Sequence, residues 1–212
     1  FVKLGCVKRS PRHLAHNIVD GKWVMKWKLV DDNKIVKARL TARGFKDRQQ
    51  DFDTFSATCT RFGARAVNSF AAQQKYRLWS LDVSAAFLKG LTFEEIQALP
   101  NGSVRSVQLE IDGPAAAVLR KIPGFEDFNP QTEVLDLLKP LWGLKDAPRL
   151  FALRLERVLI DTGHFPTKAD SKSYVKHNSA GECVSIVSTH VDDLKGASED
   201  SVRNDLCRAV EK

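Results

Sequence analysis

Two short apolar runs in this chain end in aspartate, and this pattern restricts where the two strands can lie in a fold. The β-branched run 183–190 is followed closely by Asp192 and Asp193, and the similar run 78–83 contains Asp82. Adjacent like charges at a strand end are unfavourable unless solvent or a cation compensates them. Carboxylate oxygens are good ligands for Mg2+, so the two strand ends are candidates for a site that holds divalent metal ions.

Composition places the chain among ordinary soluble globular proteins. Of its 212 residues, 43% are hydrophobic and 28% are charged, and no run of about 18 apolar residues could span a membrane. The four cysteines are far apart and show no Cys-x-x-Cys spacing, which favours a reducing intracellular setting over a zinc site or a disulfide framework. The chain begins with Phe1 rather than Met and has no secretory signal, and we expect it to be part of a longer protein.

Positive charge is concentrated in the first third of the chain. Residues 1–65 contain 15 Lys and Arg against 6 Asp and Glu, whereas the remaining residues carry a small negative net charge. Nucleic acid or nucleotide phosphate would complement this segment, although a merely solvated basic surface explains the same charge equally well.

An alternating pattern between residues 22 and 43 predicts a β-hairpin. Apolar residues alternate with lysines in 23–29, and residues 31–33 supply turn-forming side chains before a second alternating run. The second strand is expected to have one apolar face and one cationic face. The cationic face contains Lys37, Arg39, Thr41 and Arg43.

The rest of the chain predicts an α+β order of elements. Residues 60–76 are alanine-rich with apolar residues at helical spacing, and residues 150–160 form a second amphipathic pattern. Ser198, followed by acidic residues, is typical of a helix N-terminus. Further expected elements are a loop or short helix at 1–20, an irregular connection over 98–131 with strands at 104–111 and 116–122, and strands at 171–177 and 182–191.

Four blocks of sequence occur in the order and spacing of a known family. They are Lys37-Ala-Arg-Leu-Thr-Ala-Arg-Gly-Phe45, Leu81-Asp-Val-Ser-Ala-Ala-Phe-Leu-Lys-Gly90, Leu141-Trp-Gly-Leu-Lys-Asp-Ala-Pro-Arg149 and His190-Val-Asp-Asp193. Over residues 20–210 the chain resembles the reverse transcriptase of copia-type LTR retrotransposons. An Asp-Asp pair alone is a weak signal, whereas four blocks in order make a specific one.

The resemblance implies an α+β fold, the fingers and palm of a polymerase right hand, with an antiparallel sheet and helices packed on one of its faces. The thumb that the family carries is expected to be absent, because the sequence stops soon after Asp193. An N-terminal extension (1–20) would precede the fingers, which would comprise the basic hairpin with its helix (21–80). The first catalytic strand of the palm (81–98) would lead into the irregular connection (99–132). The last segments would be a template- and nucleotide-gripping turn with its helix (133–165) and the Val-Asp-Asp hairpin of the palm with the following helix (166–212).

The resemblance also implies RNA-directed DNA polymerase activity. In that reaction dNTPs are added to a primer 3′-hydroxyl with the help of two Mg2+ ions, for which Mn2+ can substitute. The implied catalytic residues and metal ligands are Asp82, Asp192 and Asp193, with the backbone carbonyl of Val83 as a further ligand. Each aspartate alone could instead be a turn or cap residue, but three together are harder to explain in that way.

On the cationic strand, the resemblance implies that Lys37, Arg39 and Arg43 bind the triphosphate, and which cation meets which phosphate stays open. Phe87 stands five residues after Asp82, where the family places an aromatic ring under the sugar that excludes a 2′-hydroxyl. Exposed strand cations are often only solvated, and a phenylalanine in this apolar run could equally belong to the core.

The block around Gly143 resembles the turn that grips template and nucleotide. A glycine there lets the backbone approach a base pair closely, and Trp142 could stack on a base or belong to the core. Lys145 and Arg149 could contact template phosphates or be surface charges, and His190 is expected beside the primer.

The chain departs from the family pattern at three places. His190 replaces the usual tyrosine before Val-Asp-Asp, and a tryptophan and Asp146 replace tyrosine and glutamine in the gripping turn. The negative charge of Asp146 would be unfavourable near phosphates unless Lys145 or Arg149 offsets it. The third departure is the connection over 97–122, which looks longer than that of the family.

The expected partners are an RNA or DNA template with its primer, dNTPs, and the thumb, ribonuclease H and integrase domains of a parent Pol polyprotein. We expect no membrane partner and a location in a cytoplasmic particle or the nucleus. Two other functions stay open: a decayed relic that only binds nucleic acid through its basic first third, and an unrelated acidic metal-site hydrolase. The intact Asp82, Asp192 and Asp193 favour the polymerase.

Overall fold

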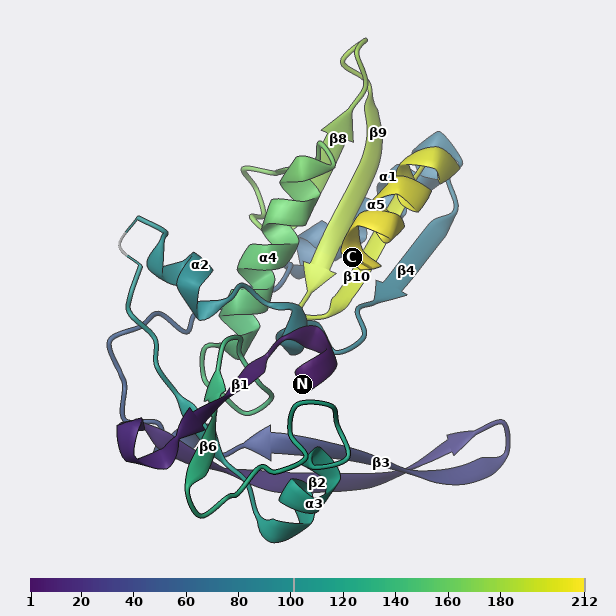
Figure 1. Cartoon of the computed structure of the whole chain (residues 1–212). Coiled ribbons are helices and arrows are strands. Elements are labelled where there is room, and N and C mark those ends of the chain that lie inside the picture. The colour runs from purple at the N-terminus through teal and green to yellow at the C-terminus, as the bar shows by residue number, and fades with distance from the viewer. Residues whose placement is uncertain (101, 212) are drawn as a thin grey trace. The chain divides into compact units, whose positions relative to one another are not determined.

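The computed structural model describes residues 1–100 and 102–211, which form two compact units (Figure 1). The N-terminal unit contains residues 1–54 and 87–150, and the C-terminal unit contains residues 55–86 and the residues from 151 onward. None of the helices described is both long enough and apolar enough to cross a membrane.

The N-terminal unit is built on a five-stranded sheet in the order β1-β6-β5-β2-β3. Its strands are β1 (Val7–Pro11), β2 (Ile18–Val30), β3 (Asn33–Ala42), β5 (Gln108–Glu110) and β6 (Glu133–Leu137). β2 and β5 run parallel, whereas the other neighbouring pairs run antiparallel. Val19, Leu109 and Leu135 lie on three different strands and are at most 2% exposed, so the middle of this sheet contributes to the core of the unit.

The hairpin predicted between residues 22 and 43 is confirmed. Residues 21–30 of β2 pair antiparallel with the whole of β3, and the two residues between the strands, Asp31 and Asp32, both have a positive φ (47° and 61°). A type I′ hairpin turn requires this conformation at both positions. On the cationic face, Lys26 lies directly opposite Lys37, and on the apolar face Trp27 is 75% exposed. The described residues therefore leave the far part of the apolar face uncovered.

One short helix replaces a strand expected in the irregular connection. The helices of this unit are α2 (Phe93–Gln97) and α3 (Gly113–Leu119). The strand expected at 116–122 is wrong, because Asp112 caps α3 by accepting a hydrogen bond from the Ala115 amide at 2.8 Å and a proline opens its first turn. Of the strand expected at 104–111, only β5 forms. The expected loop or short helix at 1–20 contains β1 and the 3-10 turns η1 (Val2–Leu4) and η2 (Arg12–Leu14).

The C-terminal unit contains an antiparallel sheet in the order β4-β10-β9-β8-β7. Its strands are β4 (Leu78–Asp82), β7 (Phe165–Pro166), β8 (Ser173–His177), β9 (Cys183–His190) and β10 (Asp193–Ser198), and its helices are α1 (Arg61–Gln74), α4 (Ala147–Asp161, from residue 151) and α5 (Asp200–Glu211). The helices lie close to where their patterns predicted them. β10 was not predicted: Ser198 ends this strand and accepts a hydrogen bond from Trp79 Nε1 at 3.1 Å, so its expected role as a helix cap is wrong.

Helices contact both faces of the C-terminal sheet. Val67 of α1 packs against Ile186 of β9, whereas Leu155 of α4 and Tyr174 of β8 line one small cavity. Tyr174 pairs with Val187, the residue after Ile186, and successive strand residues point to opposite faces. The α+β class agrees with the structure, but two sheets replace the expected single antiparallel sheet with helices on one face.

A buried histidine belongs to the core of the C-terminal unit. His164 is fully buried, its Nδ1 lies 3.0 Å from Thr162 Oγ1, and its Nε2 lies 3.0 Å from Ser185 Oγ. Burial, with a smaller contribution from the charge of Lys176, lowers the pKa of His164 to about 4. The imidazole is therefore neutral at neutral pH.

Candidate functional site

The two acidic strand ends lie side by side in the C-terminal unit. Asp82, at the end of β4, is the direct antiparallel partner of Asp193, at the start of β10. His190, at the end of β9, pairs with Asp193 on the other side. Because cross-strand partners project from the same face of a sheet, these three residues form one row at the edge of that face, which we call the acidic row.

The turn between β9 and β10 positions the third aspartate. It contains only Val191 and Asp192, and Val191 has a φ of 57°, a left-handed conformation that is rare for a β-branched residue. Ala85, just after β4, has a similar φ of 56°. The Asp192 carbonyl accepts a hydrogen bond from the Val83 amide at 3.0 Å, which ties the turn to the chain that follows β4. Residues held in such strained conformations often lie at functional sites.

The chemistry of these carboxylates suits a divalent cation. Asp82 and Asp193 are exposed and Asp192 is half-buried, and within the described residues none of the three side chains accepts a hydrogen bond or forms an ion pair. Hard oxygen donors of this kind bind Mg2+ and Mn2+. In the part of the chain that the structure describes, no group of three or more His, Cys, Asp or Glu side chains is assembled closely enough to hold a metal ion. The donor set therefore fits such an ion in chemistry, but it is not preassembled.

The cations expected to bind a triphosphate differ in their surroundings. Lys37 and Arg39 are exposed on β3 and form no ion pair with any described residue. Arg43, just beyond β3, is bound to Asp20, with 2.9 Å between Nη1 and Oδ2, and the same carboxylate lies 3.0 Å from Lys46 Nζ. An anionic ligand at Arg43 would therefore have to compete with Asp20.

The block at residues 141–149, which we call the gripping turn after its expected role, packs against the end of β3. The Ala42 amide donates a hydrogen bond to the Trp142 carbonyl at 2.8 Å, and Gly143 has a φ of 95°. A Cβ at Gly143 would overlap the carbonyl oxygen of Ala42, and one at Gly44 would overlap the carbonyl oxygen of Gly143. Gly143 thus permits two backbone segments of this chain to approach closely. A base pair beside this glycine stays a prediction.

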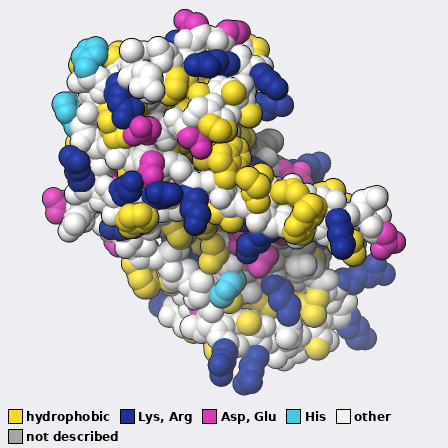
Figure 2. Space-filling view, turned by 90° about the horizontal axis from the view of Figure 1, so that it is seen from below, with side chains coloured by type: hydrophobic (Ala, Val, Ile, Leu, Met, Phe, Trp, Pro, Cys, Tyr) yellow, Lys and Arg dark blue, Asp and Glu magenta, His cyan; other side chains and the backbone are white. Residues whose placement is uncertain are grey.

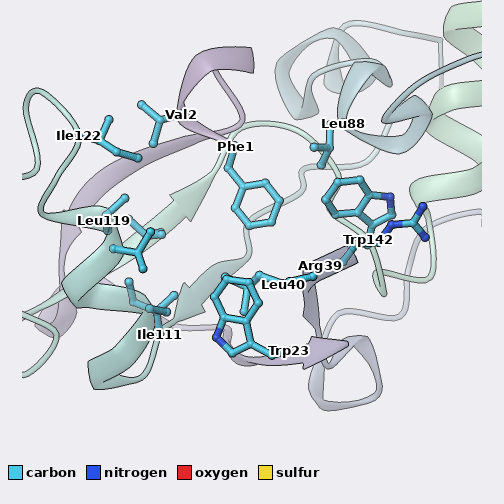
Figure 3. A pocket seen from close by; sticks show the side chains of 14 residues that line it. Phe1, Val2, Trp23, Arg39, Leu40, Leu88, Ile111, Leu119, Ile122 and Trp142 are labelled. Carbon is cyan, nitrogen blue, oxygen red and sulfur yellow. The ribbon is translucent and has the colours of Figure 1, made fainter. Parts of the chain in front are cut away.

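Trp142 forms part of the wall of an apolar pocket in the N-terminal unit (Figure 3). The indole is half-buried, and its ring centroid lies 5.9 Å from that of Phe1. The guanidinium carbon of Arg39 lies 5.6 Å from the indole centroid. Trp142 is therefore at the boundary between core and surface, and its stacking on a base stays a prediction.

Asp146 belongs to a buried charge cluster that we call the Arg105 cluster, which contains Arg105, Asp47 and Asp146. Arg105 donates from Nε to Asp146 Oδ2 at 2.7 Å and from Nη2 to Asp47 Oδ2 at 2.5 Å, and the three side chains are at most 3% exposed. The guanidinium carbon also lies 4.0 Å from the centroid of the Phe52 ring. Burial favours the neutral form of Asp47, but hydrogen bonds from Arg105 and Asn17 outweigh it and hold the pKa of Asp47 below its usual value.

The cation that offsets the charge of Asp146 is Arg105, rather than Lys145 or Arg149. Lys145 is exposed, and Arg149 forms an ion pair with Asp53 at 3.1 Å. Sequence reasoning missed Arg105, because it lies in the irregular connection and belongs to no periodic pattern or motif. The unusual aspartate at position 146 was the one signal that a compensating cation had to exist.

The structure gathers the candidate residues within each unit. Phe87 lies half-buried in the 3-10 turn η4 (Ala86–Lys89) and belongs to the N-terminal unit, as do the cationic strand and the gripping turn. The acidic row with the turn after β9 belongs to the C-terminal unit. On the face seen in Figure 2, Lys and Arg side chains are dispersed among apolar ones rather than gathered in one patch.

Comparisons with known proteins give a consistent result. A family profile described as reverse transcriptase (RNA-dependent DNA polymerase) matches residues 9–210. The retrovirus-related Pol polyprotein from transposon TNT 1-94 of Nicotiana tabacum is 31% identical over 177 residues, which cover 82% of this chain and 12% of that protein. The retrovirus-related Pol polyproteins from transposons RE1 and RE2 of Arabidopsis thaliana are each 27% identical, over 89% and 87% of this chain. The chain spans only 11–12% of the length of these three relatives.

Proposed function

Because the chain belongs to the reverse transcriptase (RNA-dependent DNA polymerase) family and is similar to copia-type Pol polyproteins, we propose that it adds dNTPs to a primer 3′-hydroxyl on a nucleic-acid template. Members of this family are nucleotidyltransferases and generally use divalent metal ions. The curated relatives are far longer than this chain, so we place the thumb, ribonuclease H and integrase of a parent polyprotein among its partners.

The observation that carries the proposal is the pairing of Asp82 with Asp193 across neighbouring strands, with Asp192 in the adjoining turn. Carboxylates held close to one another repel unless a cation compensates them. Aspartates that only cap a helix or a turn accept hydrogen bonds from nearby donors. The described residues provide no such donor to these three side chains, which supports a cation as their partner.

Within this proposal the residues of the C-terminal unit hold the metal and the primer end. Bound Mg2+ would lower the pKa of the attacking hydroxyl and neutralise charge on the triphosphate and the departing pyrophosphate. Asp82 and Asp192 would be its main ligands, with the Val83 carbonyl and Asp193 beside them. His190, in the same row as Asp193, would donate a hydrogen bond near the primer terminus.

The residues of the N-terminal unit would bind the nucleotide. Lys37 and Arg39 are exposed and carry uncompensated charge, so they would form charge-assisted hydrogen bonds to triphosphate oxygens. Arg43 would join them in exchange for its ion pair with Asp20. Phe87 would exclude a 2′-hydroxyl and so select deoxynucleotides.

The gripping turn would face the template. Trp142 and Gly143 would contact the newly formed base pair, the indole by stacking and the glycine by its bare backbone. Lys145 and Arg149 would contact template phosphates, which would make binding weaker as the salt concentration rises.

A catalytically decayed relic that only binds nucleic acid is the second candidate. The observation that favours it is the absence, among the described residues, of a preassembled group of three metal-ligating side chains. The two candidates differ in whether divalent ions bind at Asp82, because a relic that binds phosphates through its basic strand needs no metal ion.

We would test the proposal with two measurements on the whole chain. The first is Mn2+ binding followed by electron paramagnetic resonance, and the second is magnesium-dependent incorporation of dNTPs on a primed RNA template. Both compare the wild type with Asp82→Asn and with Asp161→Asn, which removes an exposed carboxylate at the end of α4.

The polymerase predicts that Asp82→Asn weakens Mn2+ binding at least tenfold (about 1.4 kcal/mol) and abolishes incorporation, while Asp161→Asn changes neither. Salt-sensitive RNA binding without incorporation, together with equal Mn2+ affinity in all three proteins, would establish the relic instead.

A further inference from the structure

The N-terminal unit contains a cavity of about 260 Å3 (Figure 3). Its walls come from both strands of the hairpin, from α3 with the residues around it, and from the gripping turn, where Trp142 closes one side. Trp23 and Leu40 supply the hairpin side, and Leu119 and Ile122 face them from the helix side. All of these residues belong to one unit, so the cavity is a property of that unit alone.

The walls are suited to a flat apolar ring. Three aromatic side chains, Phe1, Trp23 and Trp142, contribute to them, and the other lining residues apart from Arg39 are aliphatic. An apolar cavity of about 150 Å3 can hold benzene, so a cavity of this size has room for one or two fused rings. Burial of such rings against apolar walls is favourable, and aromatic faces add offset or edge contacts.

The side chain of Arg39 places a positive charge on one side of this cavity. Arg39 is the only ionisable side chain among the fourteen described residues that line it. Its guanidinium lies over the Trp142 ring and forms no ion pair within the described part of the chain, whereas Arg43, four residues on, is already bound to Asp20. An uncompensated guanidinium beside an aromatic wall pairs well with a carboxylate or sulfonate carried on a ring.

We propose that this cavity binds a small aromatic monoanion, with its ring system between Trp23, Trp142 and the apolar face of α3 and its anionic group on Arg39. The size of the cavity limits the ligand to one or two fused rings, and Arg39, the one cationic side chain among the described lining residues, favours one negative charge. An uncharged ring of the same shape would fill the same space but leave Arg39 without a partner.

Binding at this site would have a consequence for nucleotide recognition that rests on the proposed function. Arg39 is one of the cations assigned to the triphosphate, so a ligand that engages it would weaken dNTP binding. The binding itself does not depend on that function, because it can be measured without nucleotide, metal or template.

The four tryptophans make a direct test possible with the whole chain. Trp23 and Trp142 line the cavity, whereas Trp27 and Trp79 do not. We would titrate 15N-labelled protein with 2-naphthoate and follow the four indole N–H signals in 1H–15N correlation spectra. Signals would be assigned with single Trp→Phe variants, and 2-naphthamide, which has the same rings without the charge, would be titrated in parallel.

The expected result is a saturable shift of the Trp23 and Trp142 signals with a dissociation constant of about 1 mM or tighter, while the other two signals stay in place. Naphthoate should bind at least fivefold more tightly than naphthamide. Equal shifts of all four signals, the absence of saturation, or equal affinities for the two compounds would overturn the proposal.

Two pairs of matched variants test the assigned contacts. Arg39→Gln should remove the preference for naphthoate, whereas Lys37→Gln, on the same face of β3 but outside the cavity, should retain it. Val118→Glu places a negative charge in the lining at an exposed position of α3 and should weaken naphthoate binding at least fivefold. Ala117→Glu, its exposed neighbour outside the lining, should change the affinity less than twofold. Equal effects within either pair would contradict the proposed contacts.

Discussion

Lowering the pH from 7.5 to 5.0 should destabilise the protein through His164. Burial lowers the pKa of this side chain to about 4 in the folded state, compared with about 6.5 for an exposed imidazole. Because the unfolded chain then binds a proton that the folded chain does not, the free energy of unfolding falls as the pH drops between these two values. This effect of His164 leaves the free energy of unfolding almost unchanged above about pH 6.5 and reduces it by its full amount below about pH 4.

The size of the effect follows from the two pKa values. One pKa unit corresponds to about 1.36 kcal/mol. At pH 5.0 nearly all unfolded molecules carry a proton on His164, but only about a tenth of the folded ones do. The free energy of unfolding should therefore be about 2 kcal/mol lower at pH 5.0 than at pH 7.5.

Urea unfolding followed by circular dichroism at a series of pH values would measure this loss. His164→Gln keeps a side chain that can hydrogen-bond to Thr162 and Ser185 but cannot take up a proton, and His177→Gln changes an exposed histidine at the end of β8 as a control. Wild type and His177→Gln should each lose about 2 kcal/mol, and His164→Gln less than about 0.5 kcal/mol. Carboxylates contribute equally to all three proteins. If His164→Gln lost as much stability as the wild type, the buried neutral histidine would not be the cause.

Three further predictions concern single contacts. Arg105→Met should lower the free energy of unfolding by about 3–5 kcal/mol, because it leaves two buried carboxylates uncompensated. Arg208→Met removes an exposed ion pair and should change the free energy of unfolding by less than about 1 kcal/mol. Urea unfolding measures both values, and similar losses would contradict this account. Gly143→Ala should lower the unfolding temperature more than Gly124→Ala. Both glycines have a positive φ, but only at Gly143 would the new Cβ overlap backbone atoms. Equal shifts of the unfolding temperature would contradict the close approach of Gly143 to the Ala42 carbonyl oxygen. Asp170→Ala removes the acceptor for the amide and hydroxyl of Thr60, the residue that caps α1, and should lower the free energy of unfolding by about 1–3 kcal/mol. Amide hydrogen exchange in the first turn of α1 should become faster, and unchanged exchange would rule out this role of Asp170.

The hairpin and α1 could be predicted from the sequence because their signals are local. Residues 22–43 alternate with a period of two, and residues 60–76 repeat with a helical period, so neither depends on distant contacts. β10 is different: it contains Lys195 and Gly196, and its strand conformation depends on pairing with two neighbouring strands. The helix α3 differs from the strand expected at 116–122 because a short apolar run fits either conformation, and the capping residue that favours the helix, Asp112, lies outside that run.

The residues of the candidate site also differ in whether a local sequence pattern could predict their positions. Asp82 and Asp193 each end or begin a strand, so their pattern already indicated that they lie at a sheet edge. The partner of Asp146 could not be inferred, because the residues of the Arg105 cluster lie 41 and 58 positions apart and no spacing rule connects them. The only signal was the negative charge of Asp146 where phosphates are expected, and the cations considered there were Lys145 and Arg149 rather than Arg105.

Because of the Arg105 cluster, three distant stretches of this chain, around residues 47, 105 and 146, can be exchanged with those of a relative only together. A chimera that receives a shorter connection without Arg105 would keep two buried carboxylates with no cation, and a chimera that receives glutamine at position 146 alone would leave the guanidinium with one carboxylate in place of two. Exchanging Arg105 and Asp146 together would still leave Asp47 buried without its cation, so residue 47 has to change with them. We expect the connection and the residues at positions 47 and 146 to have been inherited as one set, and a graft that changes all three should fold where a graft of the connection alone does not.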